Sequence, residues 1–276
     1  MGKFSGMLLC SDIDGTLIND EHKVSLKNQL AIEYFKNEGG IFTLATGRVP
    51  SGMRMFLDKV KPNAPVISHN GSAIFDFKKN EFVWQLGLDD DVIEVVDYVT
   101  ENIPFAGVEV VIGDTVHFCK MNDTVEEHRI LEHFPLNDSN YKNLPKQWTK
   151  ILFIQTPEEL PMVKDFLLKS HFVGKYKFVQ SSPKYFEVIN LQSSKGRAMQ
   201  ELAKRLGIPM SMTIGIGDNE NDLEMVQDAA LGVAVGNAMP RVKEAANHIT
   251  VTNNFDAIAK VIADLDCGKL SMKKIS

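Results

Sequence analysis

The sequence MLLCSDIDGTL occupies residues 7–17. Its first four residues form an uninterrupted apolar run, typical of a short strand that is buried on both faces of a parallel sheet. Two carboxylates, Asp12 and Asp14, follow, and Gly15 then permits a sharp turn of the backbone. Because ligands of an open α/β sheet bind outside the carboxyl ends of its strands, we expect both acids at a binding site.

Apolar runs of the same kind recur along the chain, with amphipathic helical patterns between them. They comprise residues 41–45, 65–68, 212–216 and 231–235. Strands that alternate with helices in this way predict an α/β fold with a Rossmann-like core, in which the strands form a parallel sheet.

Two of the intervening helices have a recognisable apolar face. One follows Ser25, a predicted N-cap, and its apolar positions are Leu26, Leu30, Tyr34 and Phe35. The other begins at about Lys195 and ends before Gly207, and its apolar positions are Ala198, Met199, Leu202 and Leu206. We expect both faces to pack against the sheet.

The pattern changes between about residues 84 and 185. Two runs of alternating polarity are joined there at Gly113-Asp114, a dipeptide typical of a hairpin turn. Further strands are predicted over residues 151–155, 176–180 and 185–190, and a helix over residues 157–170. We therefore expect an inserted α/β domain with an antiparallel sheet. The predicted boundaries are residues 1–83 and 186–276 for the core and residues 84–185 for the insert.

A second acidic segment, which contains Asp218 and Asp222, follows the predicted strand over residues 212–216. It begins like a dinucleotide-binding glycine loop, but Asp218 and Glu220 would repel a pyrophosphate. If the ends of the two strands meet, the two acidic pairs bring four negative charges together. Oxygen ligands of this kind favour magnesium over zinc. Taken alone, an acidic first turn is also explained by complementation of the helix dipole.

Two other segments are suited to binding a phosphate. Thr46-Gly47-Arg48 follows the strand over residues 41–45 and offers a hydroxyl and backbone donors at the same sheet edge. Lys195 brings a cation to the helix end that least favours one, which indicates a nearby anion. The alternatives are a capping threonine beside a surface arginine, and a solvated lysine. Asn70-Gly71 is compatible with a simple turn.

Composition excludes several classes of protein. Of 276 residues, 44% are hydrophobic and 24% charged, as expected for a globular protein with a sizeable core. The formal charge of −6 gives no general reason to bind nucleic acid or an anionic membrane, so a small-molecule partner is favoured. The three cysteines are widely spaced, and no early apolar run could serve as a signal peptide. We therefore expect a cytoplasmic protein.

Together these segments resemble the haloacid dehalogenase (HAD) superfamily, in its Cof-like branch of sugar-phosphate phosphatases with a type 2 (subclass IIB) cap. The matching segments, which span about residues 8–254 in the family's order, are residues 12–16, 45–48, 70–72, 194–196, 217–222 and 232–238. The chain departs from the family's pattern at residues 191–193 and 255–258, which carry none of the expected chemistry.

The resemblance implies a magnesium-dependent phosphatase that forms an aspartyl-phosphate. Asp12 would be the nucleophile, and Asp14 the general acid and base. Mg²⁺ would be held by the Asp12 carboxylate, the Asp14 backbone carbonyl and Asp218, with Asp222 supporting them. The residues implied to bind the phosphoryl group are Thr46, Gly47, Lys195 and Asn221. The insert would close over the site as a cap that determines specificity.

The expected substrate is a small phosphorylated metabolite: a sugar phosphate, or a phosphorylated cofactor such as flavin mononucleotide or pyridoxal phosphate. Two other functions are compatible with the sequence. One is a phosphomutase of the phosphomannomutase type, and the other is a non-catalytic protein that binds a phosphorylated metabolite. Retention of the acidic residues, Thr46 and Lys195 favours catalysis. Neither the physiological substrate nor the oligomeric state follows from the residues.

Overall fold

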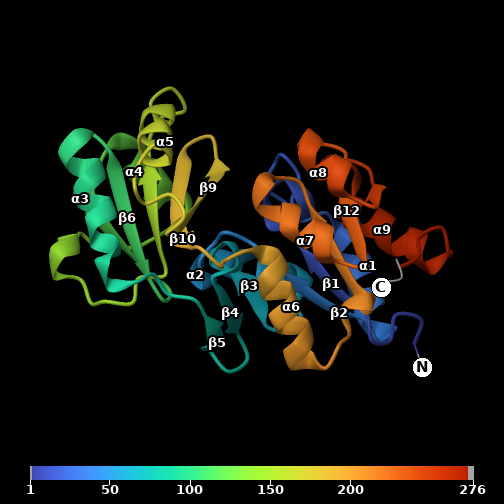
Figure 1. The fold of residues 1–276 in the computed structure, drawn as a ribbon. Helices are drawn as coiled ribbons and strands as arrows, with labels where there is room; N and C mark the ends of the chain where they lie inside the picture. The colour runs from blue at the N-terminus through green and yellow to red at the C-terminus, as the bar shows by residue number, and fades with distance from the viewer. Residues whose placement is uncertain (1, 273–276) are drawn as a thin grey trace. The chain divides into compact units, whose positions relative to one another are not determined.

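The computed structural model describes residues 2–272 and divides into two compact units (Figure 1). The first contains the residues up to Arg48, Met53–Trp84 and the residues from Ser194 onward, and the second contains Val49–Gly52 and Gln85–Ser193. The boundary expected after residue 185 lies too early. It would separate strand β10 (Tyr185–Asn190) from β8 (Lys150–Ile154) and β9 (Tyr176–Ser182), with which β10 pairs along its length.

The first unit is built on a five-stranded sheet in which every pair of neighbouring strands is parallel, as the sequence predicted. Its order is β13 (His248–Ile249), β12 (Leu231–Ala234), β11 (Thr213–Gly217), β1 (Leu8–Ser11) and β2 (Ile41–Leu44). In the register of the sheet, Cys10 of β1 lies between Gly215 and Thr43. The carboxyl ends of β11, β1 and β2 therefore lie at the same edge.

Helices bury both faces of this sheet. Leu9 lies in a buried cluster with residues of α1 (Leu26–Asn37) and α9 (Ala257–Asp266). Its neighbour Cys10 lies in a different cluster, with residues of α6 (Lys195–Leu206). The remaining helices of this unit are α7 (Leu223–Asp228), α8 (Pro240–Ala245) and most of α2 (Pro50–Val60). Of the predicted apolar face of α6, Ala198, Met199 and Leu202 are buried and Leu206 is partly buried. Gly207 ends that helix in a left-handed conformation.

The predicted apolar face of α1 is wrong in part. Leu26, Leu30 and Tyr34 are exposed, and Phe35 alone of the four predicted positions is buried. The other buried positions of the helix are Asn28 and Ile32. The Asn28 amide donates to the Leu17 carbonyl, and its oxygen accepts from the backbone N–H of Ala259 at the start of α9. These two bonds turn the Asn28 face of the helix inward.

A small three-stranded sheet adjoins the parallel sheet. It contains β3 (Val66–Ser68), β4 (Ala73–Asp76) and β5 (Glu81–Gln85), and β3 and β4 are antiparallel. Ala45, just after β2, forms an isolated parallel bridge to Ile67 of β3. The carboxyl end of β3 is thereby brought beside the end of β2.

The second unit contains a five-stranded antiparallel sheet, as predicted. Its order is β7 (Thr115–Lys120), β6 (Gly107–Ile112), β8, β10 and β9. Gly113, between β6 and β7, has a φ of 58°, which suits the predicted hairpin turn. Helices α3 (Ile93–Asn102) and α5 (Leu160–Leu168) share one buried cluster with the sheet, and α4 (Asp123–Leu131) contributes Val125 to another.

Within residues 2–272, none of the helices has both the length and the apolar character needed to cross a bilayer. The three cysteines, Cys10, Cys119 and Cys267, are free thiols.

Candidate functional site

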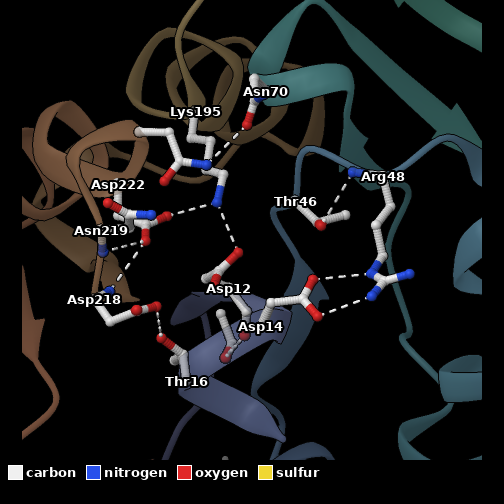
Figure 2. Close-up of polar contacts among 12 residues, drawn as sticks. Asp12, Asp14, Thr16, Thr46, Arg48, Asn70, Lys195, Asp218, Asn219 and Asp222 are labelled. Atoms are coloured by element: carbon white, nitrogen blue, oxygen red, sulfur yellow. Dashed lines mark hydrogen bonds and ion pairs between the residues drawn. The ribbon is translucent and has the colours of Figure 1, made fainter. Parts of the chain in front are cut away.

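Polar side chains from separate parts of the first unit converge in one site (Figure 2). The strands that lead into the site are β1 before Asp12, β2 before Thr46, β3 before Asn70 and β11 before Asp218. This is the arrangement expected at the carboxyl edge of an α/β sheet, where short loops replace the ladder hydrogen bonds of the strands.

Lys195 links two acids of the site. Its Nζ lies 2.7 Å from Oδ1 of Asp12 and 2.6 Å from Oδ1 of Asp222. All three side chains are buried, with exposed fractions of 1%, 7% and 0% respectively. Burial alone would lower the pKa of the Lys195 ammonium, but the two carboxylates raise it above its usual range. Lys195 is therefore a fixed cation.

Lys195 is the first residue of its helix, a position where a cation is unfavourable unless an anion lies nearby. The Ser194 hydroxyl accepts from the backbone N–H of Arg197, which caps the helix, and Lys195 is the next residue. The anion indicated by a lysine at this position is supplied by Asp12 and Asp222. The solvated-lysine alternative is wrong, because this side chain is buried.

Asp218 is held by the loop after β1 and by its own segment. The Thr16 hydroxyl donates to Asp218 Oδ1 over 2.9 Å. Asp222 Oδ2 accepts from the backbone N–H groups of Asp218 and Asn219, over 3.0 and 3.1 Å. Gly15 has a φ of 77°, and a Cβ there would lie 2.5 Å from Asp218 Oδ2. The glycine therefore gives Asp218 the room it needs beside the loop.

Three carboxylates fit a divalent cation. Asp12, Asp218 and Asp222 each offer an oxygen, and these oxygens lie within 4.8 Å of one another. Three negative charges against the ammonium of Lys195 leave a formal charge of −2. Burial and the charge of Asp222 raise the pKa of Asp12 well above its usual range and that of Asp218 to about 6. Hard oxygen donors with excess negative charge suit magnesium.

The Asp14 carboxylate has a different partner. Arg48 Nε lies 2.9 Å from Asp14 Oδ2, and Arg48 Nη2 lies 2.9 Å from Oδ1. The Arg48 backbone N–H also donates to the Thr46 hydroxyl. The sequence did not identify this pairing of Arg48 with Asp14.

Two of the expected phosphate-binding residues, Gly47 and Asn221, lie against the side chain of Asn70. Gly47 approaches the Asn70 amide so closely that a Cβ would lie 2.9 Å from Asn70 Oδ1. The Asn221 amide donates to that oxygen over 2.9 Å. Asn70 therefore belongs to the same site as Gly47 and Asn221, and the simple-turn interpretation missed it. The sequence feature that could have indicated Asn70 is its position after an apolar run, which Asp12 and Thr46 share.

Comparison with known proteins gives consistent matches. Residues 9–262 match the family model of the haloacid dehalogenase-like hydrolases. YxeH of Bacillus subtilis (strain 168) is 34% identical over 95% of this chain and 99% of its own. YcsE of the same organism, a 5-amino-6-(5-phospho-D-ribitylamino)uracil phosphatase, is 30% identical over 92% of this chain and 94% of its own. A haloacid dehalogenase-like hydrolase from Bacteroides thetaiotaomicron superposes with a TM-score of 0.83 at 25% identity, covering 94% of this chain and 99% of that one.

Proposed function

Because the chain belongs to the haloacid dehalogenase-like hydrolases and is a phosphatase of that family, we propose that it hydrolyses a small phosphomonoester with Mg²⁺ through an aspartyl-phosphate on Asp12. The observation that carries this proposal is the position of the Asp12 carboxylate. It is buried, bonded to Lys195 and within reach of two further carboxylates. A carboxylate held in this way is fixed for attack on a phosphoryl group.

Lys195 has two functions in this proposal. Its ammonium fixes one oxygen of Asp12, which orients the carboxylate, and it adds positive charge beside the transferring phosphoryl group. Electrostatic stabilisation and positioning supply most of the catalysis of phosphoryl transfer. We assign Thr46, Gly47 and Asn221 to the phosphoryl oxygens, because the family resemblance implies these positions and each residue carries a neutral donor.

Asp14 is proposed to protonate the leaving alcohol and then to take a proton from the attacking water. The two bonds from Arg48 fix the plane of this carboxylate. The Asp14 side chain is 48% exposed. This exposure suits a carboxyl group that exchanges protons with the substrate and with water.

The metal is proposed to be Mg²⁺, held by Asp12, Asp218 and the Asp14 backbone carbonyl, with Asp222 beside them. When bound, it would neutralise the nucleophile and the phosphoryl oxygens, so that two anions can approach each other. Asp222 is positioned for its supporting role by its bonds to Lys195 and to the backbone of Asp218.

The second unit is proposed to be the cap that selects the substrate. The substrate class is a small phosphorylated metabolite, a sugar phosphate or a phosphorylated cofactor, in the cytoplasm. The relative YcsE acts on a phosphorylated ribitylamino-uracil, and this compound therefore belongs in a substrate panel beside hexose phosphates, flavin mononucleotide and pyridoxal phosphate. The panel is scored by kcat/KM.

The test is phosphate release from p-nitrophenyl phosphate with Mg²⁺ and with EDTA. We expect turnover with Mg²⁺, no turnover in EDTA, and none for Asp12→Asn. Asp76→Asn, which changes the last residue of β4, whose carboxylate accepts from the backbone N–H of Lys78, is the control and keeps full activity. Activity that survives EDTA or Asp12→Asn would contradict the proposal. Interconversion of sugar 1- and 6-phosphates without phosphate release would favour the phosphomutase instead.

A further inference from the structure

Asn70 presents a buried donor that the proposed mechanism does not use. The residue is 2% exposed, and its Oδ1 accepts from Asn221 Nδ2 over 2.9 Å. Its own Nδ2 is buried and has no hydrogen-bond partner among the described residues. A buried donor without a partner is costly and uncommon in folded proteins, which points to a ligand that completes it.

The backbone holds this amide in place at a further cost. His69 and Asn70 have φ angles of 53° and 54°, in the left-handed region that side-chain-bearing residues seldom adopt. The backbone N–H of Asn70 donates to the Thr46 carbonyl over 3.0 Å, which ties the turn to the loop after β2. Backbone strain of this kind persists where the surrounding structure fixes a functional side chain.

Two glycines allow the turn to lie against its neighbours. A Cβ on Gly47 would lie 3.0 Å from Asn70 Nδ2, so the amide covers the backbone of the Thr46-Gly47 loop. Gly71 has a φ of 86°, and a Cβ there would lie 2.1 Å from the carbonyl oxygen of Ser194. The Asn70 amide therefore lies against the loop of Thr46, and its turn lies against the start of the helix that carries Lys195; Figure 2 shows Asn70, Thr46 and Lys195 in the same site.

We propose that Asn70 donates its free Nδ2–H to a phosphoryl oxygen of the substrate. This inference rests on the proposed function, because the phosphoryl group is the ligand assigned to Thr46, Gly47 and Lys195. A neutral N–H donor suits this position. It adds a bond to an anion without adding charge beside the Lys195 ammonium, and the bond to Asn221 fixes its orientation.

The experiment measures binding of orthophosphate, in the presence of Mg²⁺, by calorimetry. Asn70→Gly removes the amide and keeps a residue that tolerates a positive φ. We expect orthophosphate to bind about 10- to 100-fold more weakly, as for loss of a hydrogen bond to a charged group. The matched control is Asn80→Gly, since Asn80 is an exposed asparagine with a φ of 57°. It should bind orthophosphate like the wild type.

A second comparison separates donation from positioning. If Asn70 only orients Asn221, Asn70→Gly has no effect on orthophosphate binding in an Asn221→Ala background. If Asn70 donates to the phosphoryl group, the loss persists in that background, and this is the result we expect. An unchanged affinity in Asn70→Gly, or a loss that disappears with Asn221→Ala, overturns the inference while wild-type phosphatase activity upholds the proposed function. A wild type that neither binds orthophosphate nor hydrolyses phosphomonoesters overturns both.

Discussion

Arg48 donates two hydrogen bonds of 2.9 Å to the carboxylate of Asp14, one from Nε and one from Nη2. The guanidinium also lies over the ring of Phe56, 5.3 Å from its centroid. The planar guanidinium presents two N–H donors to the two oxygens of a carboxylate, and the single ammonium nitrogen of lysine cannot do this. The direction in which Asp14 points is therefore set by Arg48, which directly follows the Thr46-Gly47 loop.

Arg48→Lys is expected to lower kcat while leaving orthophosphate affinity close to that of the wild type. The loss should be about 10- to 100-fold for alkyl phosphates, whose leaving group needs a proton. The release of p-nitrophenolate in the first turnover should lose little, because p-nitrophenolate leaves without a proton and the attack of water comes later. Arg205→Lys, in a surface pair with Glu201, is the control. Equal losses for both leaving groups in the first turnover would show that Arg48 does not act through Asp14 as the acid.

Lys195→Met should destabilise the metal-free protein by about 3–5 kcal/mol, because it leaves the buried Asp12 and Asp222 carboxylates without their cation. Saturating Mg²⁺ should recover part of this loss. Urea unfolding with EDTA and with Mg²⁺ measures both effects. Lys23→Met, which removes an exposed pair with Glu21, should cost less than about 1 kcal/mol. A Lys195→Met protein as stable as Lys23→Met would show that the buried pair contributes nothing.

Gly15→Ala tests the contact between the loop after β1 and Asp218. The added Cβ would lie 2.5 Å from Asp218 Oδ2, so the carboxylate must move. We expect weaker Mg²⁺ binding by calorimetry and a loss of about 1–2 kcal/mol in unfolding free energy from the positive φ. Gly174→Ala is matched for backbone strain, with a φ of 87°, but has no atom within 4 Å of its Cβ. It should lose stability without losing Mg²⁺ affinity. Similar Mg²⁺ affinities in the two variants would refute the contact.

The pH dependence of the metal-free protein follows from the pKa of Asp218, which burial and the charge of Asp222 raise to about 6. Between the ordinary carboxyl pKa and about 6, the folded state binds more protons than the unfolded state. The free energy of unfolding should therefore fall as pH rises through this window, and level off above it. Mg²⁺ competes with the proton, so its affinity should rise over the same range.

Urea unfolding in EDTA from pH 4 to pH 7 measures the effect. Asp218→Asn should show a shallower decline, because one of the carboxyls with a raised pKa is gone. An identical slope in the wild type and Asp218→Asn would mean that Asp218 does not titrate in this window.

Much of the fold could be predicted from local pattern. Strands β1, β11 and β12 are buried along their whole length, so their apolar runs are continuous. Gly113 and Gly207 have positive φ angles, which explains why a glycine marks the turn at each position. The face of α1 could not be predicted, because Asn28 is turned inward by bonds to Leu17 and Ala259, which lie far apart in the sequence. The predicted boundary near residue 185 was wrong for a similar reason. The strand β10 belongs to the second unit because it pairs with β8, and this pairing joins segments that are distant in the sequence.

The acidic residues of the site could be predicted because they directly follow predicted strands. The basic residues with which they pair could not be predicted. Lys195 and Asp12 are far apart in sequence, and so are Arg48 and Asp14. Nothing in a local stretch says which cation meets which carboxylate. The role of Asn70 was left open, because Asn-Gly is also an ordinary turn dipeptide.

The most direct test of the metal site is a crystal structure of the protein grown with Mn²⁺ in place of Mg²⁺, examined for anomalous scattering. We predict a single strong peak at coordinating distance, about 2.0–2.3 Å, from carboxylate oxygens of both Asp12 and Asp218. A structure with Mn²⁺ bound elsewhere, or with these two carboxylates too far apart to share one ion, would contradict the metal site on which the proposed mechanism depends.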